Sequence, residues 1–150
     1  MLIEGKLVVS APINKLWEAI LEPETLAACM PGAEKIEKID DVTYDAIVKQ
    51  KVGPIKVRLK FRNVLTKVEP PNHLELDGEG EDMTKLGHFK QKTVVDLKET
   101  PGGEVEVSYS ANVNVVGKLA MFGDRIMRSK AKDVEKEFTT NLQARLKNVK

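Results

Sequence analysis

Apolar and polar residues alternate with a period of two at the start of the chain, over residues 2–10. Such alternation collects apolar side chains on one face, so this segment predicts a half-buried β-strand. Two short helices are expected next, one after Pro12 and one that begins at Pro23, because apolar residues there recur three and four positions apart. The second helix should end at Met30, since Pro31 disfavours helical geometry in the residue before it.

Alternation returns between residues 34 and 116, where turn-forming residues separate six further strands. Consecutive strands joined by short turns favour an antiparallel meander. The separating segments are Asp40-Asp41, Gly53-Pro54, Pro70-Pro71-Asn72, Thr84 to Gly87 and Pro101-Gly102-Gly103.

A stripe of apolar residues with helical spacing runs from Leu119 to Leu146. It predicts a helix of roughly 30 residues, about 45 Å long, which must lie along the sheet. The whole pattern therefore predicts one α+β domain over residues 1–150. Its seven strands should form a curved antiparallel sheet around the long C-terminal helix, with the two short helices between the first and second strands.

Positive and negative charges are balanced, with 24 Lys and Arg against 23 Asp and Glu and a net charge of +1. A chain this close to neutrality has no overall field that would attract nucleic acid. Alternate cations between Lys56 and Arg62 form a local basic stripe, but carboxylates of the following strand are expected to face them. Glu79, Glu81 and Asp82 are expected to point to solvent. We therefore expect no nucleic-acid partner.

Residue types that support catalysis or metal binding are sparse. Cys29 is the single cysteine, which excludes an internal disulfide, fits a cytoplasmic location and predicts a small buried apolar group. His73 and His88 lack the spacing of metal ligands and are expected at the surface. Gly78 and Gly80 have no phosphate-loop setting, and we expect them to relieve crowding where a strand curves. No metal, cofactor or catalytic residue is predicted, and no apolar run is long enough for a transmembrane segment.

Four segments together resemble the carbon monoxide dehydrogenase G-subunit family: Met30-Pro-Gly-Ala-Glu-Lys-Ile-Glu37, Val52-Gly-Pro-Ile-Lys56, Glu69-Pro-Pro-Asn72 and residues 117–127. That family belongs to the START-like (SRPBCC) superfamily, whose helix-grip fold wraps a seven-stranded antiparallel sheet around a long C-terminal helix. The resemblance implies an accessory, membrane-linked factor of molybdenum carbon monoxide dehydrogenases. It also implies that an apolar molecule, such as a lipid or quinone, is held between sheet and helix.

The stretch GKLAMFGDRIM, residues 117–127, has apolar side chains on more than one side of the expected helix start. Methionine adapts to irregular surroundings and glycine permits bending. The residues alone are equally typical of a pocket mouth and of irregular core packing, and the resemblance favours the pocket. Its expected walls are Tyr44, Val48, Val57, Leu59, Phe61, Leu76, Phe89, Val107, Tyr109 and Ala111 from the sheet, closed by Met30, Phe122, Ile126 and Met127. Three polar residues share the inward parity and are expected to orient oxygens of a guest: Gln50, Gln91 and Thr93.

Three functions are consistent with this pattern. The favoured one is a non-enzymatic binding or carrier protein for an apolar small molecule, accessory to a carbon monoxide dehydrogenase type enzyme and able to touch a membrane peripherally. The second is an interaction module with a solid interior, whose long helix binds a partner protein through its basic outer face. The third is a cyclase- or aromatase-like enzyme that uses Tyr44 or Tyr109 as the acid.

Overall fold

The structure is a computed structural model that describes residues 1–147. Strands and helices follow one another in the predicted order. Their bounds are β1 Leu2–Ser10, α1 Ile13–Leu21, α2 Pro23–Cys29, β2 Ala33–Lys38, β3 Thr43–Val52, β4 Ile55–Glu69, β5 His73–Asp82, β6 Gly87–Thr100, β7 Glu104–Gly117, the 3-10 helix η1 Lys118–Phe122 and α3 Gly123–Lys147.

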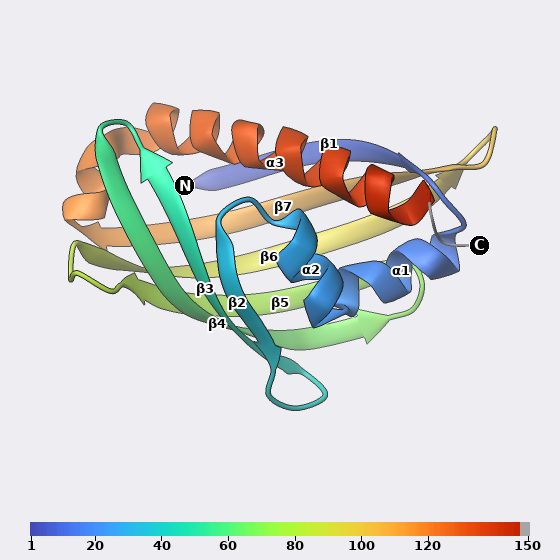
Figure 1. Ribbon diagram of the computed structural model, residues 1–150, viewed down its shortest axis with the longest axis horizontal. Helices are drawn as coiled ribbons and strands as arrows, with labels where there is room; N and C mark the ends of the chain where they lie inside the picture. Colours follow the sequence, from blue (N-terminus) through green and yellow to red (C-terminus); the bar gives the residue numbers. More distant parts are fainter. Residues whose placement is uncertain (148–150) are drawn as a thin grey trace.

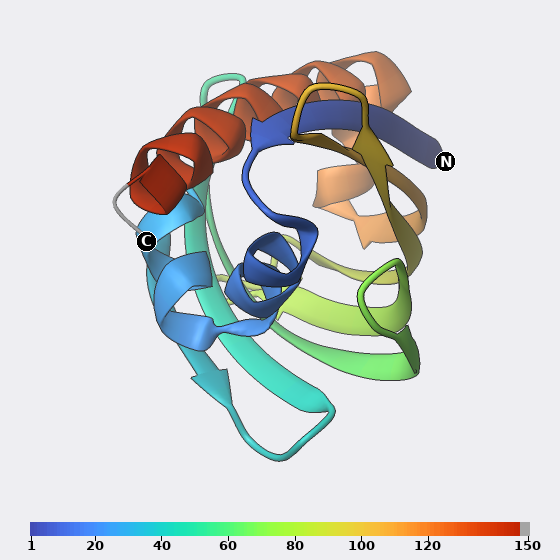
Figure 2. The same cartoon turned by 90° about the vertical axis from the view of Figure 1, so that its right-hand side faces the viewer.

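One sheet contains all seven strands in the order β1-β7-β6-β5-β4-β3-β2. Every neighbouring pair is antiparallel, and β1 pairs with β7 instead of β2. The sheet curves into an open half-barrel with α1 in its opening (Figure 2), and α3 runs the length of the molecule beside β1 (Figure 1). The main contacts of α3 are with β1 and α2, at the margin of the sheet. The predicted fold class is confirmed.

Proline fixes the start of both short helices. Pro12 precedes α1 with an extended backbone, and Pro23 is the first residue of α2. The missing N–H of proline has no partner to lose in a first helical turn. The buried face of α1 includes Leu16 and Trp17, and α2 ends at Cys29, which is 1% exposed. The expectation that Cys29 is a small buried group is confirmed.

The long C-terminal helix begins in two pieces, whereas the sequence pattern predicted one continuous helix. Leu119 lies in η1, and α3 starts only at Gly123. Gly117 and Gly123 have φ angles of 88° and 76°, in the left-handed region that favours glycine. The two glycines end β7 and then redirect the chain, which explains the absence of a regular helix start.

Buried apolar residues form two separate clusters toward the two ends of the half-barrel. The larger cluster joins α1 and the last turns of α3 to β1, β6 and β7, and includes Leu16 and Leu142. The smaller cluster joins the β3–β4 hairpin to η1 through Val52 and Leu119. The middle of the concave face has buried residues that belong to neither cluster: Tyr44, Ala46, Val48, Ala111 and Val113.

The outer face of the sheet carries the alternating charges that the sequence predicted. The register sets Arg62 of β4 opposite Glu79 of β5. The short ion pairs of β4 nevertheless form with β3 and β2 and not with β5. Arg62 pairs with Asp45 of β3 and Arg58 pairs with Glu34 of β2, each with a nitrogen–oxygen distance of 2.7 Å. Exposed pairs of this kind contribute little stability, so the outer face is a solvated and largely self-neutralised surface.

Asp82 is buried, and the prediction that it points to solvent is wrong. Its carboxylate is fully enclosed and accepts hydrogen bonds from the backbone N–H groups of Arg58, Thr84 and Leu86, at 2.9, 2.9 and 3.3 Å, and from the Thr84 hydroxyl. Burial raises the pKa of this carboxyl, but the hydrogen bonds outweigh burial and hold the pKa below its usual value. Asp82 therefore fixes the turn between β5 and β6.

Candidate functional site

The concave face between the two clusters holds much of the predicted pocket wall. Three neighbouring rows of paired residues cross the sheet there, and directly paired side chains point to the same face. The rows are Tyr44-Asn63-Gly78-Gln91-Val113, Ala46-Phe61-Gly80-Phe89-Val115 and Leu65-Leu76-Thr93-Ala111-Ile3.

Glycine occupies the β5 position in two of these rows. A Cβ atom on the first of them, Gly78, would collide with Asn63 Oδ1 and would lie 2.9 Å from Gln91 Nε2. In the row of the second glycine, the rings of Phe61 and Phe89 approach to 6.0 Å between centroids. Side chains from β4 and β6 therefore converge over β5, at positions where β5 itself has none.

Three polar side chains in these rows have an atom or group without a hydrogen-bond partner among residues 1–147. Asn63 Oδ1 is shielded from solvent and has no hydrogen-bond partner among the described residues. The half-buried side chains of Gln91 and Thr93 take part in none of the side-chain hydrogen bonds within residues 1–147. Sequence reasoning missed Asn63, although its place two residues after Phe61 in an alternating strand assigns it to the inward face.

The two predicted wall tyrosines are both hydrogen-bonded. The Tyr44 hydroxyl donates to the main-chain carbonyl of Leu21 at 2.6 Å, which links β3 to α1. The Tyr109 hydroxyl donates to Glu135 Oε1 of α3 at 2.7 Å. Burial raises the pKa of Tyr44, and burial together with the Glu135 carboxylate raises the pKa of Tyr109. Both phenols therefore remain protonated donors at neutral pH.

Glu135 joins the site without having been predicted. Its side chain is only 11% exposed, and its Oε2 atom lies 3.8 Å from Lys132 Nζ. Gly5 of β1 makes room for the pair, because a Cβ atom there would collide with both Glu135 Oε1 and the Tyr109 hydroxyl. A glycine at an inward strand position is the signal for such a close approach.

The other predicted wall residues are divided between the middle of the face and the two clusters. Val48 and Ala111 are buried in the middle, and Val107 lies in the larger cluster with Leu76 packed against it. Val57 lies in the smaller cluster. Three more predicted residues pack against that smaller cluster: Leu59, Phe122 and Met127.

Three predicted residues lie at the margin of the site. Ile126 is 42% exposed on α3, and Met30 is half-buried at the end of α2. The Gln50 amide donates to the Pro31 carbonyl at 2.7 Å, so it holds the turn between α2 and β2. Gln50 is therefore engaged by the main chain, whereas Gln91 and Thr93 are not.

Two hollows lie beside the first half of α3. One has a volume of about 200 Å³ and reaches the inner face through Val113, Val115, Leu119 and Met127. The other has a volume of about 330 Å³ and is lined by Leu2, Ile3, Glu4, Tyr109, Arg128, Ala131 and Lys132. Residues of β7 thus line both hollows, which lie at successive turns along one face of the helix.

A family model that describes the carbon monoxide dehydrogenase subunit CoxG matches residues 5–147. The chain belongs to the CoxG family. The resemblance that four short segments indicated is thereby confirmed over nearly the whole chain. None of the curated proteins matches this CoxG chain.

Solved structures share the fold of this CoxG protein. A conserved protein from Geobacillus kaustophilus is 22% identical, with a TM-score of 0.89 over 98% of this chain and 95% of that chain. A START superfamily protein from Mycobacterium smegmatis is 10% identical, with a TM-score of 0.73 over 99% of each chain. A protein from Chromobacterium violaceum is 18% identical, with a TM-score of 0.72 over 97% of this chain and 96% of that chain. These likenesses establish the START-like fold.

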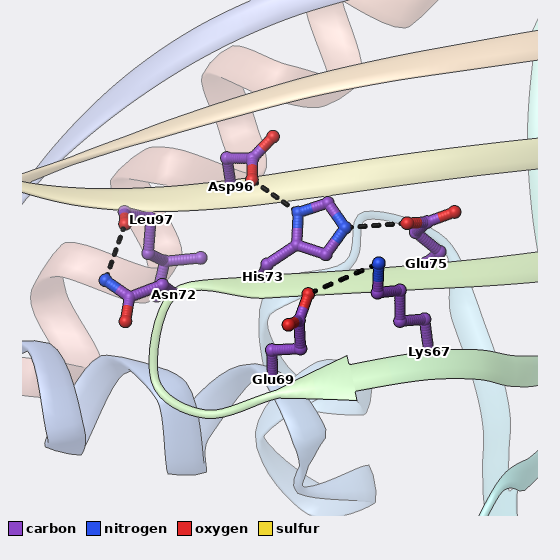
Figure 3. Close-up of polar contacts among 7 residues, drawn as sticks. All are labelled: Lys67, Glu69, Asn72, His73, Glu75, Asp96 and Leu97. Carbon is purple, nitrogen blue, oxygen red and sulfur yellow. Dashed lines mark hydrogen bonds and ion pairs between the residues drawn. The ribbon is translucent and has the colours of Figure 1, made fainter.

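His73 of this CoxG protein lies on the opposite, outer face of the sheet. Its ring is held between two carboxylates, with Nδ1 2.5 Å from Asp96 Oδ1 and Nε2 2.7 Å from Glu75 Oε2 (Figure 3). The hydrogen bonds to Asp96 and then to Glu75 raise the pKa of His73. Among residues 1–147 no group of three or more His, Cys, Asp or Glu side chains is arranged so that it could hold a metal ion. The contact between His73 and Asp96 joins β5 to β6, and this polar group is separate from the concave face.

Proposed function

We propose that this CoxG protein binds an apolar small molecule, such as a lipid or a quinone, between the sheet and α3. It acts as a non-enzymatic carrier accessory to a carbon monoxide dehydrogenase type enzyme. One observation carries the proposal: the middle of the concave face is left out of both apolar clusters. Phe61 and Phe89 are only half-buried there, although they point to the inside of the half-barrel. Aromatic rings that no core encloses offer contact area to a guest.

Burial of apolar area would supply most of the affinity. At about 25 cal/mol per Å², a guest that buries roughly 300 Å² gains about 7 kcal/mol before the costs of association. The two hollows beside the first half of α3 support entry of the guest along the seam between the helix and β7. Recognition would then depend mainly on shape, with Gln91 and Thr93 available for polar contacts.

The hydrogen bonds of Tyr44 and Tyr109 favour a binding protein over an enzyme that uses one of these tyrosines as an acid. Tyr44 donates to a main-chain carbonyl, and Tyr109 donates to Glu135. Both hydroxyl protons therefore make bonds that fasten helices to the sheet, which argues against either tyrosine as a general acid. The partner, a molybdenum carbon monoxide dehydrogenase, is proposed from membership of the family alone.

The end of the molecule around η1 supports a peripheral membrane contact, where an apolar guest could be collected. Met121 is 84% exposed, and its neighbour Ile126 is 42% exposed. A backbone hydrogen bond of 2.9 Å from Leu119 to Leu86 ties η1 to the β5–β6 turn. The β3–β4 hairpin reaches the same end (Figure 1). Exposed apolar side chains continue over this end at 38–39% exposure: Ile55, Met83 and Val116.

Cations surround this apolar end, which suits an anionic lipid surface. Four of them have no carboxylate within ion-pair distance among the described residues, namely Lys51, Lys56, Lys118 and Arg125. Within residues 1–147 no helix is at once long enough and apolar enough to span a bilayer. The proposed contact is therefore with the membrane surface.

Flotation with phosphatidylglycerol vesicles tests this contact. The Met121→Asp variant should no longer float with the vesicles, whereas the Ile39→Asp variant should still do so.

A substitution that fills the middle of the concave face tests the carrier function. Ala111 is 8% exposed in that region, so Ala111→Phe should block the guest space. Nile red is a neutral apolar dye. Its affinity for the wild-type protein should be at least about 10-fold higher than its affinity for Ala111→Phe. The matched control is Ala144→Phe, at an exposed position of α3. Circular dichroism verifies that both variants fold, and equal dye binding by all three proteins would refute the proposal.

A further inference from the structure

The unpartnered polar groups of the concave face point to the chemistry of the guest's polar end. We infer that the guest carries a hydroxyl group, which lies between the side-chain amides of Asn63 and Gln91 beside Gly78. This inference rests on the proposed function, because it assigns a ligand class to the same site.

Asn63 provides an acceptor that the described residues leave without a donor. Its Oδ1 atom is shielded from solvent and has no partner among residues 1–147. An acceptor left in this state costs about 1–3 kcal/mol, and folded proteins seldom leave one unsatisfied. A guest that brings a hydrogen-bond donor to Asn63 removes this cost on binding, so the site selects for a donor.

Gln91 provides a donor on the other side of the same row. A Cβ atom at Gly78 would touch both amides, since it would collide with Asn63 Oδ1 and lie 2.9 Å from Gln91 Nε2. The two groups therefore converge over a residue without a side chain. A hydroxyl both donates and accepts, so a single one can donate to Asn63 and accept from Gln91. A ketone or ether oxygen can only accept, which leaves Asn63 Oδ1 unsatisfied, so a quinone guest would fit this row in its reduced, hydroxyl-bearing form.

The charges that surround this row do not favour an anionic guest on the sheet side. The rows through Asn63, Phe61 and Thr93 contain no charged residue. Across from them, the Glu135 carboxylate of α3 is already bonded to Tyr109. A carboxylate guest would need a cation from another element, such as α3, where Lys130 is half-buried. An ionised head without a paired cation is costly to bury.

Matched single-chain ligands test the inference. Tetradecan-1-ol, its methyl ether and tetradecanoate each displace Nile red from the wild-type protein, and their half-displacement concentrations are compared. The alcohol should act at a concentration about 3- to 10-fold lower than the ether, which is the effect of one hydrogen bond. In Asn63→Leu this difference should vanish, with ether binding changed less than twofold. Asn112→Leu, an outward substitution of the same type on β7, should keep the difference.

Each outcome separates the chemistry of the guest from the carrier function. Equal displacement by alcohol and ether overturns the inference and leaves the carrier function standing, because water then satisfies Asn63. Preference for tetradecanoate also overturns the inference, because a cation and not the amides would then hold the polar end of the guest. Failure of the wild-type protein to bind Nile red or any of the three ligands overturns the proposed function itself. If Asn63→Leu does not fold, Gln91→Leu tests the donor side. It should weaken the alcohol and the ether alike, by the effect of one hydrogen bond, and leave the preference for the alcohol in place, whereas unchanged binding of both ligands overturns the inference.

Discussion

The hydrogen bond from Tyr109 to Glu135 should stabilise the fold more than the bond that Tyr44 makes. Both bonds are short, 2.7 Å for Tyr109 and 2.6 Å for Tyr44, and Tyr109 is half-buried whereas Tyr44 is buried. Their acceptors differ, because Tyr44 meets a neutral main-chain carbonyl and Tyr109 meets a carboxylate. A neutral hydrogen bond contributes about 0.5–1.5 kcal/mol to stability and one to a charged group about 1.5–3 kcal/mol.

The surroundings of Glu135 place this bond toward the upper end of that range. The carboxylate is 11% exposed, so little water is available to replace the lost phenol, and Lys132 is 3.8 Å away. Tyr109→Phe should therefore lower the free energy of unfolding by about 2–3 kcal/mol, and Tyr44→Phe by about 1 kcal/mol. The two variants remove the same atom, which makes Tyr44→Phe a matched control.

Urea unfolding followed by circular dichroism measures these differences. The set includes Tyr109→Phe, Glu135→Gln and the double variant, and the coupling between the two residues should be about 1.5–3 kcal/mol. Glu137→Gln, an exposed change on the same helix, should leave stability unchanged within about 0.5 kcal/mol. The reasoning fails if the coupling is below about 0.5 kcal/mol, or if Tyr109→Phe costs no more than Tyr44→Phe.

Two further predictions concern groups whose pKa values the fold displaces. Asp82→Ala leaves the donors of the β5–β6 turn without their acceptor and should cost about 3 kcal/mol or more at pH 7, against little for the exposed Asp77→Ala. Because the folded pKa of Asp82 is lowered, this stabilisation is present above the unfolded value of about 4 and is lost as pH falls through the folded pKa; urea unfolding at pH 7 and pH 3 checks the decrease. The pKa of His73 is raised, so its stabilisation is fully present below the unfolded value of about 6.5 and is lost as pH rises through the folded pKa. The stability difference between wild type and His73→Gln should therefore shrink in thermal unfolding from pH 6 to pH 9, and a constant difference would contradict the assignment.

The fold could be predicted because each element has a local cause. Alternation gave the strands one apolar face, Pro12 and Pro23 marked the starts of the short helices, and short turns favoured antiparallel pairing. The break at Gly123 was less accessible, because the apolar stripe continues through it. A positive φ angle depends on where β7 delivers the chain, and this is a tertiary property.

The sequence predicted which face of the sheet each site residue occupies, but not how deeply the residue is buried. Val57 and Phe61 share one parity on β4, yet Val57 is 4% exposed in the smaller cluster and Phe61 is half-buried outside it. The difference depends on where η1 and α3 cover the sheet, which alternation does not encode. Asp82 shows the opposite failure, since its parity matched inward Gly78 and Gly80 and only its charge argued for solvent. Four local donors compensated the charge.

The inward residues of β5 indicate that the middle of this sheet does not maximise the stability of the fold. β5 is the central strand of the seven, where a solid core would receive large inward side chains. Two successive inward positions of β5 are glycine, and glycine inside a strand weakens it. The side chains that converge over Gly78 are the amides of Asn63 and Gln91. The Asn63 Oδ1 atom is buried without a partner among residues 1–147, which opposes folding. Curvature alone accounts for small residues on β5 but not for unpartnered amides beside them. A guest that satisfies those amides accounts for both.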